Sequence, residues 1–84
     1  MKLSLTYSAD REMEQIPGPP LREIGEAILS LADDPLPHGA SVLEGQGGCL
    51  YLPIGQYYIL YHIDSTDQGL TVLGVVEGPV QTLH

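Results

Sequence analysis

The chain has 84 residues, of which 17% are charged and 43% are hydrophobic, and its net charge is −8. This length predicts one domain over residues 1–84, because a single compact core is usual up to roughly 150 residues. No apolar run reaches the roughly 18 residues that span a membrane, and acidic residues follow the start too closely for a signal peptide. We therefore expect a cytoplasmic protein with no membrane contact. The one cysteine, Cys49, excludes an internal disulfide.

The negative charge is unevenly distributed along the chain. The three basic residues, Lys2, Arg11 and Arg22, all precede residue 23. Nucleic-acid affinity comes mainly from Lys and Arg that neutralise phosphates, so direct binding of DNA or RNA is disfavoured. A basic protein partner, or none, fits the charge better. The acidic residues that carry the whole net charge are Glu23, Glu26, Asp33, Asp34, Glu44, Asp64, Asp67 and Glu77.

The first half of the chain predicts a strand and two helices. Residues 3–7 alternate apolar and polar side chains, which is typical of a half-buried strand, and Ser8 is the expected cap of a short helix over residues 9–16. The Pro and Gly residues at 17–20 end that helix. Residues 33–48 are rich in Pro and Gly and predict a loop. The second helix is predicted over residues 21–32, where one stripe contains Leu21, Ile24, Ala27, Ile28 and Leu31.

The second half predicts a meander of three strands. Strands over 49–54 and 57–64 are joined by Gly55-Gln56, a pair typical of a type II′ hairpin. A third strand over 70–76 follows. The predicted fold class is therefore α+β: a small antiparallel sheet, made of the N-terminal strand and the C-terminal three-stranded meander, with the two N-terminal helices packed on one face. The hairpin register puts on the core face Leu50, Leu52, Ile54, Tyr57, Ile59, Tyr61 and Ile63, and the third strand adds Leu73 and Val75.

The opposite face of this sheet is predicted to be apolar and aromatic, although a solvent-facing sheet surface is normally polar. We therefore expect a partner chain, a second copy or a ligand to cover it. Tyr51 and Tyr58 are the expected anchors, because tyrosine is enriched in protein interfaces. The face contains Cys49, Tyr51, Pro53, Tyr58, Leu60, His62, Val72, Gly74 and Val76. The residues predicted to bind a protein are Tyr51, Pro53, Tyr58, Leu60, Val72 and Val76.

Cys49 and His62 lie opposite each other in the predicted hairpin, close enough for a thiolate–imidazole pair. The simpler interpretation is a buried small apolar residue beside a hydrogen-bonded histidine. It is favoured because no acidic residue orients the histidine and no Gly-rich oxyanion turn follows the cysteine. The three histidines, His38, His62 and His84, have no fixed spacing, so neither a metal site nor a cofactor is expected.

A short pattern follows the loop: LEGQGGCLYLPIGQYYILYHID at 43–64, then LTVLGVVEG at 70–78. It resembles the RelE/ParE toxin superfamily. In that family a Leu-Lys-Gly element precedes a hairpin with an Arg-rich strand, a Gly-Asp-Tyr-Arg turn and a Tyr-x-Ile-Asp strand end. The order of elements agrees along nearly all the chain. The matching positions are Leu43, Gly45, Gly55, Tyr57, Tyr61, Ile63 and Asp64.

The resemblance implies a small antiparallel sheet carrying two helices. It also implies a type II toxin–antitoxin setting, in which an antitoxin covers the sheet and its flanks. Many members cleave messenger RNA on the ribosome, and others poison DNA gyrase. Some members use C-terminal residues as general acid or base, which makes His84 a weak catalytic candidate beside Cys49 and His62. A frayed end is nevertheless the default expectation for a final residue.

The sequence departs from the RNA-cleaving members at their basic positions. Glu44, Tyr51, Pro53 and Tyr58 stand where those members have Lys or Arg, and Glu77-Gly78-Pro79 replaces a basic segment. Loss of one group that stabilises transition-state charge typically costs about 2.7–4 kcal/mol. An active ribonuclease is therefore not expected, and the catalytic residues are unknown. The predicted function is that of a toxin-like protein that binds an antitoxin-like partner or forms a homodimer. The alternative is a non-toxic binding or self-associating module that retains only the fold.

Overall fold

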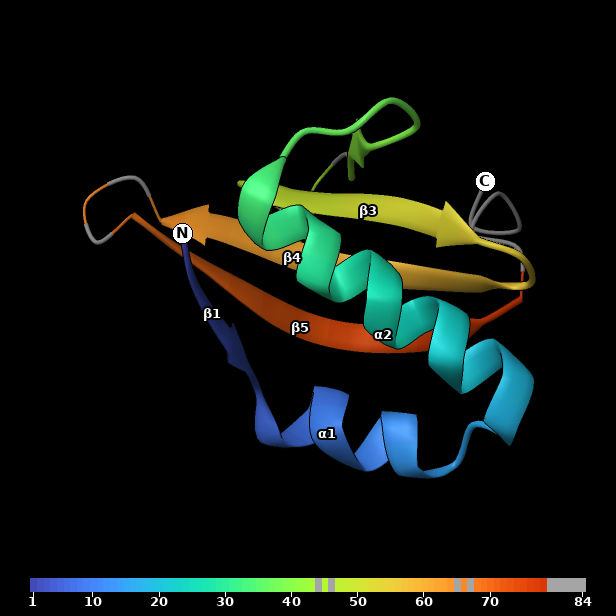
Figure 1. The fold of residues 1–84 in the computed structure, drawn as a ribbon. Coiled ribbons are helices and arrows are strands. Elements are labelled where there is room, and N and C mark those ends of the chain that lie inside the picture. The colour runs from blue at the N-terminus through green and yellow to red at the C-terminus, as the bar shows by residue number, and fades with distance from the viewer. Residues whose placement is uncertain (44, 46, 65, 67, 79–84) are drawn as a thin grey trace.

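The structure is a computed structural model that describes residues 1–43, 45, 47–64, 66 and 68–78. The described elements are strand β1 (Lys2–Leu5), helix α1 (Tyr7–Glu14), helix α2 (Gly18–Asp33) and strands β2 (Ser41–Val42), β3 (Cys49–Ile54), β4 (Tyr57–Asp64) and β5 (Gly69–Glu77). The sheet has the order β1-β5-β4-β3-β2, in which β1 is parallel to β5 and the other neighbours are antiparallel. Helix α2 crosses one face of the sheet, and α1 lies beside β5 (Figure 1). The predicted α+β fold class is confirmed, but the prediction of a wholly antiparallel sheet is wrong, because β1 runs parallel to β5.

The core lies between α2 and the sheet. The predicted stripe on α2 is confirmed, because Ile24, Ile28 and Leu31 are buried against the strands. The helix begins at Gly18, three residues earlier than predicted, because the first turn of a helix tolerates proline where the N–H groups lack partners anyway. The other buried members of the core cluster are Ala9, Ile16, Leu52, Ile59, Tyr61, Leu70, Val72 and Val75.

Thr6 joins β1 to α1 and fixes both to β5. The predicted cap Ser8 is wrong, because the helix begins at Tyr7 and the Thr6 hydroxyl accepts a hydrogen bond from the N–H of Ala9 at 3.1 Å. The same hydroxyl donates to the carbonyl of Leu73 at 3.0 Å. The N–H of Thr6 donates to the carbonyl of Val72 at 3.0 Å, so β1 ends at Leu5 and the chain turns into α1.

Helix α1 protects the part of β5 that β1 does not reach. The carboxylate Oε1 of Glu12 accepts a hydrogen bond from the N–H of Val75 at 2.8 Å. This bond satisfies a strand N–H at an open edge, where an unpaired group would otherwise invite another strand. The preceding residue is Gly74, and a Cβ there would lie 3.0 Å from the same Oε1. The absence of a side chain at Gly74 therefore leaves room for the carboxylate.

The predicted hairpin and its register are confirmed. Ile54 pairs with Tyr57 and Cys49 pairs with His62, so residues 49–64 form two adjacent antiparallel strands. Gly55 has a φ of 61°, whereas Gln56 is outside the positive-φ region. A positive φ at the first central residue alone is the requirement of a type II′ turn, which explains the glycine at this position.

Strand β5 contains a bulge that the sequence did not indicate. Leu60 pairs with Gly74 and Tyr61 pairs with Val72, which leaves Leu73 without a partner in β4. One extra residue exchanges the two faces for every residue beyond it. The prediction that put Val72 on the outer face is therefore wrong, as is the prediction of Leu73 on the core face. Val72 is 0% exposed in the core, and Leu73 is 38% exposed.

The predicted loop at residues 33–48 contains one short strand. Ser41 and Val42 of β2 pair with Tyr51 and Leu50 of β3, so this segment forms an edge of the sheet. No helix within the described ranges is long and apolar enough to cross a membrane.

Candidate functional site

The outer face of the sheet, opposite α2, carries five of the six residues predicted to bind a protein. Register places Pro53 beside Tyr58, and Tyr51 beside Leu60. Val76 of β5 pairs with Tyr58 of β4. The sixth residue, Val72, belongs to the core instead, and Thr71 occupies the outer-face position next to His62. We call the surface made by Tyr51, Pro53, Tyr58, Leu60 and Val76 the outer face.

Two tyrosine rings lie at the centre of the outer face. Tyr51 and Tyr58 are diagonal neighbours on β3 and β4, and their ring centroids are 5.9 Å apart at an interplanar angle of 56°. Tilted rings at this separation attract each other because the edge of one ring meets the electron-rich face of the other. The contact holds each ring in a defined orientation, so the two side chains offer a preformed aromatic surface to a partner.

Cys49 and His62 are cross-strand partners, as the register predicted. The thiol is buried and its Sγ lies 3.7 Å from the carbonyl oxygen of Leu50, whereas His62 is exposed. Burial raises the pKa of the Cys49 thiol, although a hydrogen bond from the backbone of Tyr61 partly offsets this effect. A nucleophilic cysteine needs the opposite shift, since the thiolate is the reactive form. The geometry thus favours the interpretation of Cys49 as a buried apolar residue.

The remaining candidates give no catalytic arrangement among the described residues. His84 and Glu44 lie outside the described residues, as does Pro79. His38 is exposed in the segment between α2 and β2. Within the described ranges, no three His, Cys, Asp or Glu side chains are placed to hold a metal ion.

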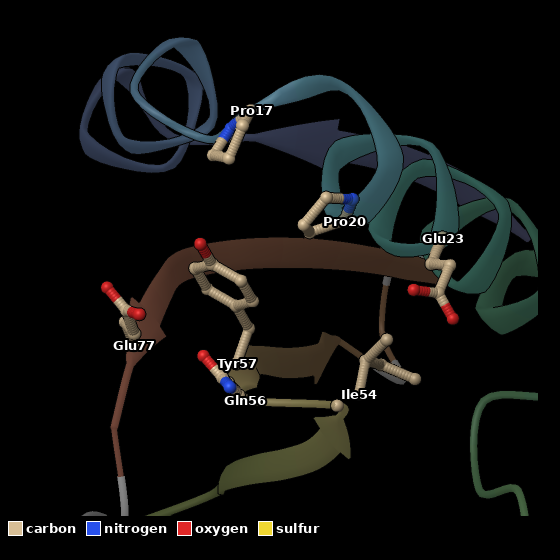
Figure 2. A pocket seen from close by; sticks show the side chains of 8 residues that line it. Pro17, Pro20, Glu23, Ile54, Gln56, Tyr57 and Glu77 are labelled. Carbon is tan, nitrogen blue, oxygen red and sulfur yellow. The ribbon is translucent and has the colours of Figure 1, made fainter.

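A cleft of about 430 Å³ lies on the other side of the sheet, where the start of α2 passes the tip of the β3–β4 hairpin. Figure 2 shows Pro17 and Pro20 on its helical side, with Tyr57 and Ile54 across from them. Glu23 and Glu77 stand at its opposite ends. We call this space the hairpin cleft. Its volume falls within the range of roughly 300–1,000 Å³ that small ligands occupy in proteins.

A second hollow of about 210 Å³ adjoins the hairpin cleft and shares Tyr57 and Glu77 with it. Glu12 also lines this hollow. The pairing of Tyr57 with Glu77 at the end of the sheet puts both side chains on one face. We did not predict this site, because Tyr57 was interpreted as a core residue. Glu77 is the residue in the sequence that could have indicated this site. It follows the core residue Val75 by two positions, so strand alternation puts it on the core face. A charged residue at that position indicates that the apolar core has ended there.

Solved structures with the same arrangement include toxins of toxin–antitoxin systems. The RelBE2 toxin–antitoxin complex of Mycobacterium tuberculosis contains a chain that matches with a TM-score of 0.81 and 24% identity, over 90% of this chain and 95% of that chain. The isolated RelE toxin of E. coli matches with a TM-score of 0.80 and 14% identity, over 93% of this chain and 84% of that chain. The fold is that of the RelE/ParE toxins. A YoeB/ParE toxin from Agrobacterium tumefaciens gives a TM-score of 0.79 and 20% identity, over 94% of this chain and 100% of that chain.

These likenesses are structural. No protein-family model matches the sequence, and no curated protein is significantly similar to it. The expected resemblance to the RelE/ParE superfamily is therefore confirmed at the level of the fold.

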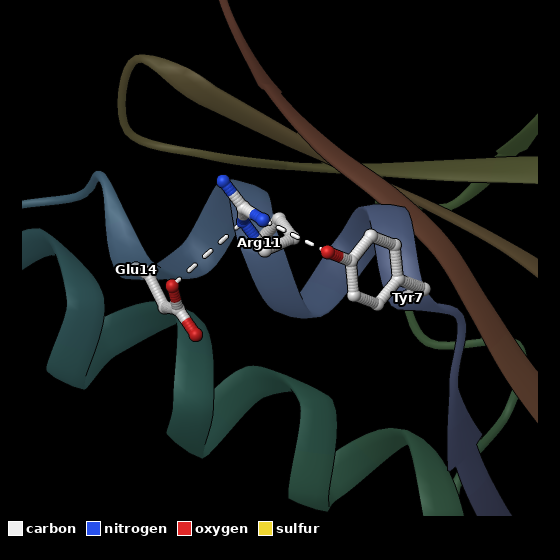
Figure 3. Close-up of polar contacts among 3 residues, drawn as sticks. All are labelled: Tyr7, Arg11 and Glu14. Atoms are coloured by element: carbon white, nitrogen blue, oxygen red, sulfur yellow. Dashed lines mark hydrogen bonds and ion pairs between the residues drawn. The ribbon is translucent and has the colours of Figure 1, made fainter.

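On this RelE/ParE fold the Lys and Arg residues lie outside the three strands that form the outer face. Lys2 lies in β1, Arg11 in α1 and Arg22 in α2, and the sequence of β3 to β5 contains no Lys or Arg. Arg11 is already engaged within α1: its Nη1 donates to the Tyr7 hydroxyl at 2.8 Å, and its Nε lies 3.9 Å from Oε1 of Glu14 (Figure 3). The Cζ atom of Arg11 is 5.7 Å from the centroid of the Tyr7 ring. Because Nη1 of Arg11 bonds to the Tyr7 hydroxyl, the guanidinium lies toward the hydroxyl end of this ring.

Proposed function

We propose that this chain is a toxin-like component of a type II toxin–antitoxin system that acts by binding a protein and does not cleave messenger RNA. The observation that supports this proposal is a RelE/ParE fold whose three C-terminal strands contain no Lys or Arg. Cleavage of RNA requires groups that bind the phosphate backbone and stabilise charge on the scissile phosphate. Tyr51, Pro53 and Tyr58 lie on the outer face at positions where the resemblance expects such cations.

An antitoxin-like protein is the proposed partner. The structurally similar RelBE2 of Mycobacterium tuberculosis and RelBE of E. coli were solved as toxin–antitoxin complexes. In this chain the outer face offers two mutually packed tyrosines and apolar neighbours, which are suited to the centre of a protein interface. The partner is expected to carry net positive charge, because this chain carries −8.

The nuclease activity is tested with purified protein in a reconstituted translation reaction containing ribosomes and a defined messenger RNA. We expect the RNA to remain intact, because the loss of even one such cation costs about 2.7–4 kcal/mol, or roughly a hundredfold to a thousandfold in rate. RNA ends are mapped by primer extension, with an active RelE toxin as the positive control. Cleavage above the ribosome-only background would overturn this part of the proposal. Expression of the chain alone, with growth and protein synthesis followed, tests toxicity separately.

Partner binding is tested with the product of the adjacent open reading frame. We expect Tyr51→Ser with Tyr58→Ser to weaken binding about thirtyfold or more, because central interface tyrosines typically contribute about 2 kcal/mol or more. Tyr7→Ser is the matched control, since Tyr7 is an exposed tyrosine on α1 that is not one of the outer-face residues. Isothermal titration gives the affinities, and circular dichroism verifies that each variant is folded. Equal affinity for the double variant and the control would remove the outer face from the interface.

Self-association is the second candidate function, favoured by the same apolar outer face. Sedimentation of the purified chain distinguishes it from partner binding. A stable dimer that Tyr51→Ser with Tyr58→Ser converts to a monomer supports self-association through the outer face. A monomer that binds only the neighbouring protein supports the antitoxin-like partner.

A further inference from the structure

We propose that the hairpin cleft is the docking site for an arginine side chain carried by a basic segment of the protein partner. This inference rests on the proposed function, since it assigns a second contact to the same partner. The cleft lies on the opposite side of the sheet from the outer face, so a partner that occupied both would pass around the end of the hairpin.

The walls of the hairpin cleft suit the flat, partly apolar arginine side chain. Pro17, Pro20 and Ile54 form apolar surface, against which the aliphatic stem of an arginine is able to pack. The Tyr57 ring stands between the helical side and the hairpin tip (Figure 2). A guanidinium over a tyrosine ring is attracted by the electron-rich face, and the attraction grows when the cation is partly removed from water.

The charge of the cleft complements a cation. Glu23 and Glu77 line the hairpin cleft, and Glu12 lines the adjoining hollow, whereas neither set of lining residues includes Lys, Arg or His. The salt bridge described in the structure joins Arg11 to Glu14, and neither residue lines the hairpin cleft or the adjoining hollow. The carboxylate of Glu12 already accepts a hydrogen bond from the N–H of Val75. Glu23 and Glu77 are therefore the carboxylates that we assign to the partner's arginine. At physiological ionic strength the Debye length is about 8 Å, which keeps such charges effective within a cleft of this size.

The geometry of the cleft is set by backbone pairing. Tyr57 is fixed from both sides, by Ile54 of β3 and by Glu77 of β5. The N–H of Gly78 donates to the carbonyl of Gln56 at 2.9 Å and ties the end of β5 to the hairpin turn. The aromatic wall and one carboxylate therefore sit on the rigid sheet, which lowers the cost of ordering them when a ligand binds.

Arginine is chosen over lysine because its planar guanidinium stacks on an aromatic ring and donates two parallel hydrogen bonds to a carboxylate. The lysine ammonium does neither as well, since it is a compact and strongly hydrated charge. This distinction allows the probes of the experiment to differ in one chemical group.

The first experiment titrates short Gly-flanked peptides, with Arg, Lys or citrulline as the central residue, into isotope-labelled protein. Citrulline matches the shape of arginine without its charge. We expect amide shifts centred on Gln56, Tyr57 and Glu77 with the Arg peptide, weaker shifts with Lys, and none with citrulline. Equal shifts with Arg and citrulline, or shifts spread over all acidic surfaces, would overturn the assignment.

The second experiment compares charge-matched variants. Glu23→Gln and Glu77→Gln together should weaken binding of the Arg peptide about tenfold or more, because the guanidinium would lose its charge-assisted hydrogen bonds to carboxylates. Glu26→Gln with Asp33→Asn removes the same charge from α2 outside the cleft and should leave binding within about twofold. Tyr57→Phe keeps the aromatic ring and should bind the Arg peptide, whereas Tyr57→Leu removes the ring and should not bind it. Thermal unfolding verifies that both Tyr57 variants are folded. Equal binding by the two charge variants would contradict the proposal.

The same variants separate this inference from the proposed function. If the neighbouring protein binds the Glu23→Gln, Glu77→Gln variant as tightly as the unmodified chain, the cleft assignment fails while partner binding stands. If no neighbouring protein binds but the Arg peptide still shifts Tyr57, the proposed partner fails and the cleft remains a guanidinium site.

Discussion

Val72→Asp should leave the protein largely unfolded, whereas Val76→Asp should fold. Val72 is 0% exposed and faces Tyr61 across the β4–β5 pair, so its replacement would bury a carboxylate without a partner. A domain of this size is stable by roughly 0.05–0.15 kcal/mol per residue, and burial of an unpaired charge costs several kcal/mol. The cost is therefore comparable to the whole free energy of unfolding.

Val76 provides the matched control for this prediction. It lies in the same strand, four residues along, but on the outer face and partly exposed. Circular dichroism and the dispersion of amide resonances report whether each variant folds. The comparison tests the bulge directly, because strict alternation puts both valines on the outer face. Similar thermal stability for the two variants would mean that β5 is regular and that the bulge at Leu73 is absent.

Tyr61→Ala should cost about 3–5 kcal/mol, and Tyr61→Phe about 1–3 kcal/mol. The ring is 0% exposed in the core, and its hydroxyl donates to the carbonyl of Pro35 at 2.7 Å. The alanine variant loses the ring and leaves a cavity, whereas the phenylalanine variant loses only the hydrogen bond that ties the end of α2 to the sheet. Chemical denaturation gives both free energies of unfolding.

The Tyr61 hydroxyl also predicts a loss of stability in alkali. Burial raises its pKa in the folded protein, and the nearby negative charge of Asp34 raises it further. Below a pH of about 10 the Tyr61 hydroxyl is protonated in both the folded and the unfolded state, so its full contribution to the free energy of unfolding is present. Above that pH the unfolded chain ionises first, so stability is lost until the higher folded pKa is passed. The difference between the unmodified protein and Tyr61→Phe should therefore shrink above pH of about 10.

The control for this pH effect is Tyr61→Phe itself. The thiol of Cys49 also has a raised pKa, and its ionisation lowers stability in both proteins, so it cancels in the difference. A difference that stays constant between pH 8 and 11 would show that the hydroxyl of Tyr61 is not protected from ionisation in the folded state.

The local features of the fold were predictable because each depends on residues close in the chain. The hairpin register follows from Gly55-Gln56, where only the first central residue needs a positive φ. The stripe of Ile24, Ile28 and Leu31 follows from helical periodicity. From the hairpin register, the core face of β3 and β4 and the four outer-face residues on these two strands were correctly placed.

The errors arose where a contact distant in sequence decided the local structure. Thr6 and not Ser8 caps α1, because the Thr6 hydroxyl also reaches the carbonyl of Leu73, 67 residues away. The bulge at Leu73 lies where β1 ends, and no pattern within β5 announces it. Sequence alternation therefore misplaced Val72, since a bulge changes the face of a residue without changing its hydrophobicity.

Composition and periodicity alone determined that this protein has no Lys or Arg on its three C-terminal strands, that the first two of these strands form a type II′ hairpin, and that the chain has an α+β fold. These properties depend on residue identity and on neighbours in the chain. Only the tertiary structure decided that Val72 is in the core, that β1 runs parallel to β5, and that Tyr57 and Glu77 face the prolines at the start of α2. These depend on which distant segments meet, and that is set by the packing of the whole chain.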